Sequence, residues 1–262
     1  VNFDKLTQEE IFQELLRREI ETDKAKKISV VKFEIFTGKK FFITKFLQVK
    51  VEKFFVRQKC SRGDSMQYKR ILALGDIHGK FQKLSSVFNK INFDAEKDFL
   101  ILLGDYVDRG EENLHCLQWA MKISELPNVV ALRGNHEQMM WNFYVEGSFG
   151  STIWLPNGGQ KTRKELEEWS KSDPDFLKKA LKFIEERPLY YRMFIGKQEY
   201  IFCHAGLKPG VPLESQVESD LLWIRDEFYY YYDGTAEVVV GHTPTPYLGK
   251  IPGSSSDAVN YR

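Results

Sequence analysis

ILALGDIHG, residues 71–79, joins four apolar residues to a polar segment bounded by glycines. Two similar junctions follow, FLILLGDYVDRG at residues 99–110 and VVALRGNHE at residues 129–137. Apolar runs of this length, separated by helical stretches at about 81–91 and 113–124, are typical of buried parallel strands in β-α-β units. Open α/β sheets bind ligands at the carboxyl ends of such strands, so we expect the polar residues to gather at one edge of a sheet.

Two shorter blocks later in the chain repeat this arrangement. HAG, residues 204–206, follows an apolar strand expected at 200–203, and GHT, residues 241–243, follows one expected at 238–240. Four of the five histidines of the chain fall in the five blocks. The fifth, His115, lies in the middle of an expected helix and is interpreted as structural.

The polar residues of these blocks are the types that bind divalent metal ions. Mn²⁺ and Zn²⁺ accept carboxylate and imidazole ligands, and two ions about 3.5–4 Å apart need one bridging oxygen ligand. Asp105 is the expected bridge, while Asp76 and His78 point to the same side of an extended segment and can share the first ion. A single Gly-Asp is usually a turn and a single histidine is usually a core residue, but the conjunction favours a metal site. The six candidate ligands are Asp76, His78, Asp105, Asn135, His204 and His242.

Length and composition describe a soluble globular protein. At 262 residues and 30.7 kDa, the chain can hold one large domain, or a catalytic domain with a small appendage. No stretch approaches the roughly 18 apolar residues of a membrane span, and the N-terminus does not resemble a signal peptide. The three cysteines are widely spaced and form no CxxC pair, so the sequence suggests neither a disulfide framework nor a zinc knuckle. We therefore expect a cytoplasmic location and no membrane partner.

The first 65 residues differ from the rest of the chain in charge and pattern. Residues 1–70 hold 17 Lys and Arg against 10 Asp and Glu, whereas the remainder holds 21 against 27. A capping box predicts a helix over residues 8–27, two or three short strands are expected between 28 and 56, and residues 57–69 are interpreted as a linker. This basic segment could bind nucleic acid or a protein, but a solvated face on a small packing domain is favoured, so nucleic acid is not an expected partner.

Blocks of the form GDxHG, GDxVDRG, GNHE, HAG and GHT, in this order, resemble the phosphoprotein phosphatase family of serine/threonine phosphatases among the calcineurin-like metallophosphoesterases. The resemblance covers about residues 70–246, and NGGQKT at 157–162 and LWIR at 222–225 are similar to its bacterial and phage branch. It implies a four-layer α/β/β/α sandwich over residues 66–262. Residues 1–65 lie outside the resemblance, and their pattern predicts a small α+β appendage of unknown role. Family members continue past the last histidine with another strand, so the resemblance implies that the closing strands are missing.

The resemblance also implies a role for each polar residue. His136 would be the general acid and Asp108 its partner, whose carboxylate is expected to raise the imidazole pKa. Arg109 and Arg225 would bind the phosphoryl oxygens. Two divalent ions are implied, with Mn²⁺ expected and Fe or Zn as alternatives. Two other readings stay open at this point: Asp108 could cap a helix that begins near Glu111, and Arg225 could pair with a neighbouring carboxylate.

The implied function is that of a metal-dependent serine/threonine protein phosphatase, which hydrolyses phosphomonoesters by direct attack of a metal-bridging hydroxide. Its partner would be a phosphorylated protein, and no oligomeric state is predicted. No cysteine lies in a CxxxxxR loop, which argues against a cysteine-based phosphatase. One alternative is a diadenosine tetraphosphate hydrolase, although those enzymes often carry Ala at the position of Asp108 and Asp at that of Glu137. Another is a binding protein with an inactive phosphatase domain, against which the intact ligand set argues.

Overall fold

The computed structural model describes residues 41–43, 46–56, 66–147, 152–195 and 197–244. One four-stranded sheet has the order β2-β3-β4-β5. Its strands β3, β4 and β5 are parallel, and β2 pairs antiparallel with β3. Helices α2 and α3 connect the parallel strands, which confirms the predicted β-α-β units. The bounds are β2 Phe46–Val56, β3 Met66–Leu74, α2 Phe81–Ile91, β4 Asp98–Leu102, α3 Asn113–Ile123 and β5 Val129–Ala131.

A second four-stranded sheet has the order β1-β8-β7-β6. Strand β8 runs parallel to β1 and β7, and β6 forms an antiparallel hairpin with β7. Strands β7 and β8 contain the apolar runs predicted at 200–203 and 238–240, whereas β6 was not anticipated. The bounds are β1 Phe41–Ile43, β6 Tyr190–Ile195, β7 Gln198–Cys203 and β8 Glu237–Val240.

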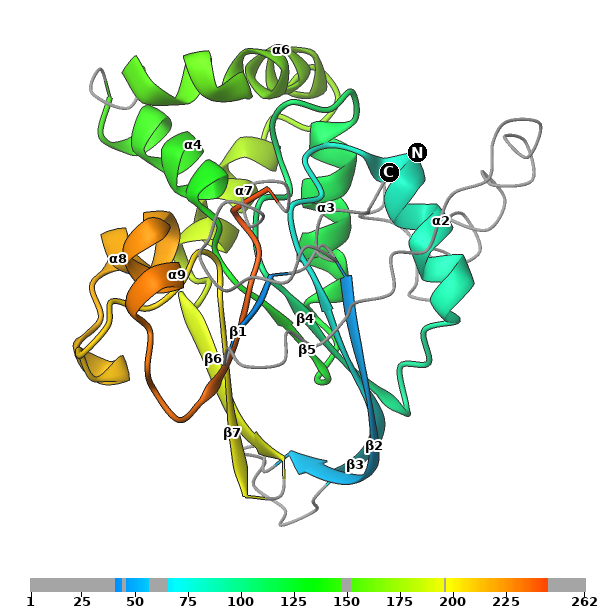
Figure 1. Ribbon diagram of the computed structural model, residues 1–262. Coiled ribbons are helices and arrows are strands. Elements are labelled where there is room, and N and C mark those ends of the chain that lie inside the picture. Colours follow the sequence, from blue (N-terminus) through cyan, green and yellow to red (C-terminus); the bar gives the residue numbers. More distant parts are fainter. Residues whose placement is uncertain (1–40, 44–45, 57–65, 148–151, 196, 245–262) are drawn as a thin grey trace.

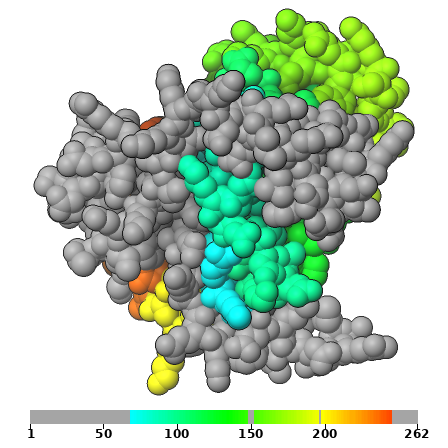
Figure 2. All heavy atoms as spheres, turned by 90° about the vertical axis from the view of Figure 1, so that its right-hand side faces the viewer, coloured from blue at the N-terminus to red at the C-terminus, as the bar shows by residue number. Residues whose placement is uncertain are grey.

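The remaining helices follow the strand ends or cover the sheets. They are α4 Asn135–Val145, the π-helical turn η2 Leu155–Gly159, α6 Gln160–Trp169, α7 Phe176–Glu185, the 3₁₀ turn η3 Leu213–Ser215, α8 Glu218–Trp223 and α9 Asp226–Tyr231. Figure 1 shows α2 and α3 beside β3 and β4, and α8 and α9 on the side of β6 and β7. Figure 2 shows the face that carries α2, in blue-green, with α6, in yellow-green, at one end.

Alternation along the strands builds three apolar layers. In β3, Leu72 and Leu74 belong to the core shared with α2 and α3, whereas Ile71 and Ala73 belong to a core that also contains Phe202 and Val239 of the other sheet. Successive side chains of a strand point to opposite faces, so a strand buried on both faces has to be apolar throughout. A third core packs β7 and β8 against α8 and α9. The order helix, sheet, sheet, helix confirms the predicted four-layer sandwich.

The N-terminal strands are part of this sandwich. β1 and β2 fall within residues 1–65, which are expected to form an appendage, yet β2 is hydrogen-bonded to β3 and β1 to β8. Residues 66–69, interpreted as the end of a linker, belong to β3. The pairing partner of an edge strand is set by the whole sheet and not by the local pattern. The predicted helix at 8–27 and the predicted loss of closing strands concern residues outside the described ranges.

No described helix combines the length and the hydropathy that a membrane crossing needs.

Gly104 allows β4 to end in a tight turn. Its φ is +93°, and a Cβ added there would lie 2.4 Å from the backbone N of Gly134. We expect Gly104→Ala to lower the free energy of unfolding by about 3 kcal/mol, because it adds a backbone clash to the strain of a positive φ. Gly210→Ala is the matched control, since its φ of +72° is similar and its added Cβ meets nothing within 4 Å. Urea unfolding measures both variants. If Gly104→Ala and Gly210→Ala lower the free energy of unfolding equally, the positive φ alone explains the loss and the backbone clash does not.

Candidate active site

The candidate residues lie at the carboxyl ends of strands from both sheets. In the sheet formed by β2 to β5, Asp76 and His78 follow β3, Asp105 follows β4, and Asn135 begins α4 after β5. In the other sheet, His204 follows β7 and His242 follows β8. The loop after each strand therefore brings its polar residue to one place, as the sequence predicted.

Several of these residues have a left-handed backbone, which is uncommon for side chains other than glycine. The φ angles are 51° at Asp76, 47° at His78, 58° at Asp105 and 60° at His242. Such conformations cost about 1–3 kcal/mol each and cluster at functional sites, where the surrounding structure holds them. Strain at four residues that follow three strands, β3, β4 and β8, indicates that the direction of these side chains matters for the site.

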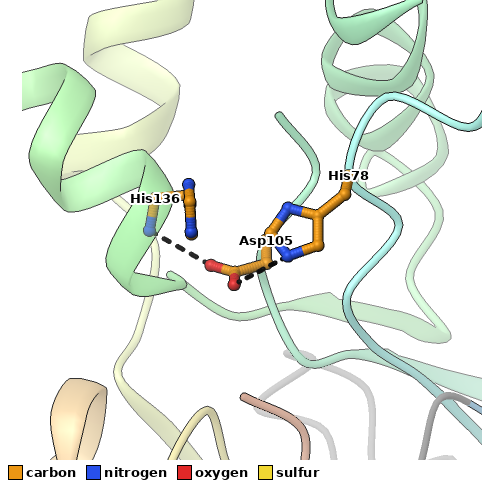
Figure 3. Close-up of side chains that lie close together, drawn as sticks. All are labelled: His78, Asp105 and His136. Atoms are coloured by element: carbon orange, nitrogen blue, oxygen red, sulfur yellow. Dashed lines mark hydrogen bonds and ion pairs between the residues drawn. The ribbon is translucent and has the colours of Figure 1, made fainter. Parts of the chain in front are cut away.

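Asp105 lies between two groups of imidazoles. Its Oδ2 is 3.5 Å from Nε2 of His78, and its Oδ1 is 3.4 Å from Nε2 of His204. Candidate ligand atoms of His78, Asp105 and His136 lie within 4.8 Å of one another, and so do those of Asp105, His204 and His242. Figure 3 shows Asp105 between His78 and His136. This shared position is the one expected of a bridging ligand.

Backbone carbonyls and Asn135 orient the imidazoles. Nδ1 of His78 is 2.9 Å from the carbonyl oxygen of Val107, and Nδ1 of His204 is 2.8 Å from that of Leu103, so both rings turn Nε2 inward. Oδ1 of Asn135 is 2.8 Å from Nε2 of His204 and 3.1 Å from Nδ1 of His242. The three residues predicted to hold the second ion are therefore in mutual contact.

Asp76 is placed differently from its predicted partner. Its Oδ1 accepts the backbone N–H of His242 at 3.0 Å, which ties the loop after β3 to the loop after β8. Among the described residues, the group around His78 contains His136 in place of Asp76. That Asp76 and His78 share one ion stays a prediction.

The donor set fits divalent cations. The side chain of Asp105 is buried, and burial raises its pKa well above the ordinary value, with Glu137 and Asp76 acting in the same direction. Burial lowers the pKa of His78 to about 3 and that of His242 to about 2, so both imidazoles are neutral and keep a lone pair. Buried carboxylates beside neutral imidazoles are the environment that bound cations compensate.

His136 and Asp108 form a buried pair, as predicted. Nδ1 of His136 is 2.6 Å from Oδ2 of Asp108. The expected rise in the imidazole pKa is wrong: burial lowers the pKa of His136 to about 3 and raises that of Asp108 to about 7. Burial, which disfavours the charged form of each group, is the largest cause of both shifts, and Arg109 lowers the pKa of His136 further. The alternative role of Asp108 as a cap is not observed, because the N-cap of α3 is Glu112.

Both predicted arginines reach the centre. Nη1 of Arg109 is 2.9 Å from Nε2 of His78, and Nε of Arg225 donates to Nε2 of His242 at 3.1 Å. Arg225 therefore points into the site and not toward a surface carboxylate. Phosphate binding by the two guanidinium groups stays a prediction.

Glu137 organises the loop that carries Asp105, a role that the sequence analysis missed. Its carboxylate accepts the backbone N–H groups of Asp105 at 2.7 Å, Tyr106 at 2.8 Å, Val107 at 3.2 Å and Gly134 at 3.1 Å. The signal available in the sequence was a charged residue at the start of a helix, next to an apolar strand. Several backbone donors converge on this one buried side chain.

Glu137→Ala should lower the free energy of unfolding by at least about 3 kcal/mol, because it leaves buried N–H groups without an acceptor. Glu137→Gln keeps one acceptor oxygen and should fall between the wild type and the alanine variant. Urea unfolding of the three proteins in chelator measures the order. A stable alanine variant would contradict the role assigned to Glu137.

This chain is similar to a phosphoesterase family and to proteins that carry phosphatase names. Residues 69–260 match the family described as calcineurin-like phosphoesterase. Serine/threonine-protein phosphatase 1 of Salmonella typhimurium is 29% identical over 190 residues, which cover 70% of this chain and 82% of the relative. An asymmetrical bis(5′-nucleosyl)-tetraphosphatase of Bacillus cereus is 26% identical over 197 residues, which cover 65% and 77%. A solved protein serine/threonine phosphatase of Saccharomyces cerevisiae is 24% identical with a TM-score of 0.38, covering 63% of this chain and 46% of that one.

The family match extends over most of the chain and contains all six candidate ligands together with His136, Asp108 and both arginines. The name of the family describes phosphoester hydrolysis. The two groups of side chains around Asp105 could hold the metal ions that this reaction uses. The four-layer sandwich, the donor set at its strand ends and the matched sequence therefore lead to one conclusion: this chain belongs to the calcineurin-like phosphoesterase family, as a metal-dependent hydrolase.

Proposed function

We propose that the protein is a serine/threonine protein phosphatase that hydrolyses phosphomonoesters of a phosphorylated protein in the cytoplasm. The observation that carries the proposal is the buried His136–Asp108 pair, with 2.6 Å between Nδ1 and Oδ2. The alkoxide that leaves phosphoserine is a strong base and needs a proton donor. The phosphate that leaves a dinucleoside polyphosphate is a weak base, so an elaborate acid pair favours the phosphomonoester.

The chain's own residues would divide the work as follows. Nδ1 of His136 is engaged by Asp108, so Nε2 is the atom left to protonate the leaving oxygen. The negative charge of a bound phosphoryl group would raise the pKa of the ring from its low value in the free site and so favour the charged form that donates the proton. Arg109 and Arg225 would bind the phosphoryl oxygens through their forks of N–H donors. Two divalent ions, Mn²⁺ in our proposal, would supply Lewis acidity and an activated water when bound. The residues that would hold them are Asp76, His78, Asp105, Asn135, His204 and His242.

A second candidate is hydrolysis of a dinucleoside polyphosphate, because several relatives carry that activity in their names. Mn²⁺-dependent phosphate release from a phosphoserine peptide, run beside cleavage of diadenosine tetraphosphate, separates the two. An Asp105→Asn variant is the control for contaminating enzymes. We expect turnover of the peptide. Preference for the dinucleotide would replace the proposal with the second candidate, and inactivity on both despite bound Mn²⁺ would favour a binding role.

A further inference from the structure

The block NGGQKT, residues 157–162, contributes nothing to the candidate metal centre, yet it contacts the acid pair. Thr162, on α6, is completely buried. Its hydroxyl accepts the backbone N–H of Asp108 at 3.1 Å and donates to Oδ1 of the same residue at 2.5 Å. Because the hydroxyl oxygen already accepts an N–H, its own proton is directed at the carboxylate. One side chain thus fixes both the backbone and the carboxylate of Asp108.

Trp154 holds the second carboxylate oxygen. Its Nε1–H donates to Oδ2 of Asp108 at 2.9 Å, and Nδ1 of His136 lies 2.6 Å from the same oxygen. The indole N–H can only donate, so Oδ2 has to accept from it. The carboxylate is thereby held at both oxygens, by donors that are 46 and 54 residues away in sequence.

The glycines of the block allow this approach. Gly158 has a φ of +111°, and a Cβ there would lie 2.9 Å from Cγ of Arg109. A Cβ at Gly159 would lie 2.5 Å from Cδ2 of Trp154. Any larger residue at either position would push the π-helical turn away from Arg109 or displace the indole ring.

We propose that Thr162 and Trp154 are positioning residues that fix the carboxylate of Asp108, and through it the imidazole of His136, in the direction that proton donation requires. The inference rests on the proposed role of His136 as the proton donor. Neither side chain would touch the substrate. Their effect would pass through the orientation of one ring, where a misplacement of about 1 Å can cost 10²-fold in rate.

The test compares two esters that differ in their need for an acid. Phenol is a weaker acid than 4-nitrophenol, so phenyl phosphate depends more on protonation of its leaving oxygen. We expect Thr162→Val, which keeps the shape and removes the hydroxyl, to lower kcat on phenyl phosphate by about 10- to 100-fold. On 4-nitrophenyl phosphate kcat should fall by less than about threefold, and KM should change little on either ester.

Two further variants separate positioning from folding. Thr162→Ser restores the hydroxyl and should recover the wild-type ratio of the two rates. Leu166→Ala removes a buried apolar side chain from the same helix, one that has no polar atom to bond Asp108, so it should lower stability and leave the ratio unchanged. An equal loss on both esters, or failure of the serine variant to recover the ratio, would overturn the inference.

A second measurement does not depend on activity. The short hydrogen bond at Nδ1 of His136 should give a strongly deshielded proton in the ¹H NMR spectrum of the wild type, absent from a His136→Asn variant. The resonance should shift in Thr162→Val and return in Thr162→Ser. An unchanged resonance in Thr162→Val would reject the inference. If the wild type hydrolyses neither ester, the proposed function fails, while this resonance still decides whether Thr162 orients the pair.

Discussion

Asp105→Asn should reduce phosphoesterase activity by about 10³-fold or more, because it removes the charge that the two metal-competent groups share. The substituted amide can still accept the backbone N–H of His136, which Oδ1 of Asp105 accepts at 3.1 Å, so the loop need not unfold. Metal analysis after dialysis should show less Mn²⁺ per chain than in the wild type. Activity and metal content should fall together.

The same substitution should stabilise the protein in chelator. Burial raises the pKa of Asp105, so its carboxyl favours folding at acidic pH, and this contribution is lost as the pH rises through the folded pKa. The Asp105→Asn variant has no carboxyl group to ionise, so its free energy of unfolding at neutral pH should exceed that of the wild type by about 1–3 kcal/mol.

Mn²⁺ should reverse this difference. At 100 times its dissociation constant, it should raise the free energy of unfolding of the wild type by about 2.7 kcal/mol. Thermal unfolding with and without chelator checks both signs, and Asp173→Asn, at a surface ion pair, is the matched control. If Mn²⁺ stabilises the Asp105→Asn variant as much as the wild type, Asp105 is not a metal ligand.

His136→Asn should lower kcat on a phosphoserine peptide by about 10²- to 10⁴-fold with little change in KM, since it removes the proton donor and not the phosphate contacts. The loss should be smaller on 4-nitrophenyl phosphate, whose leaving group is a weaker base. Steady-state kinetics on both substrates measures the difference.

Metal content decides between two roles for His136. The ring lies in one group with His78 and Asp105, so its position alone would also suit a ligand. As a proton donor held by Asp108, it should be replaceable without loss of bound Mn²⁺. Asp108→Asn should also retain the metal and lose rate, because its target is the orientation of the same ring. Loss of one ion from His136→Asn would reassign the residue as a ligand.

The sequence was sufficient for the strands that carry the ligands and for the gathering of those ligands. Each ligand directly follows an apolar run, and parallel strands in one sheet end at one edge, so local pattern determines position. Asp105 is predictable as a bridge because its block lies on a central strand, β4, between β3 and β5.

What the sequence could not supply depends on contacts between distant segments. Neither the pairing of β1 with β8 nor the contact of Thr162 with Asp108 produces a periodic pattern in the local sequence. Burial depth is equally hidden, and it reverses the expected pKa shift of His136. A histidine and an aspartate in a sequence motif look the same whether the folded pair is exposed to water or buried, so the motif does not predict the direction of the pKa shift.

The two sheets each hold only part of the ligand set, and this has a consequence for cooperativity. The hydrogen bond from His242 to Asp76 spans 166 residues, and that from His204 to Leu103 spans 101. Cations bound between the two sheets would link residues that are far apart in the sequence. The entropy lost in closing such long loops grows only slowly with their length. Occupancy should therefore slow amide hydrogen exchange in β3, β4, β7 and β8 together, as a single protected unit and not sheet by sheet.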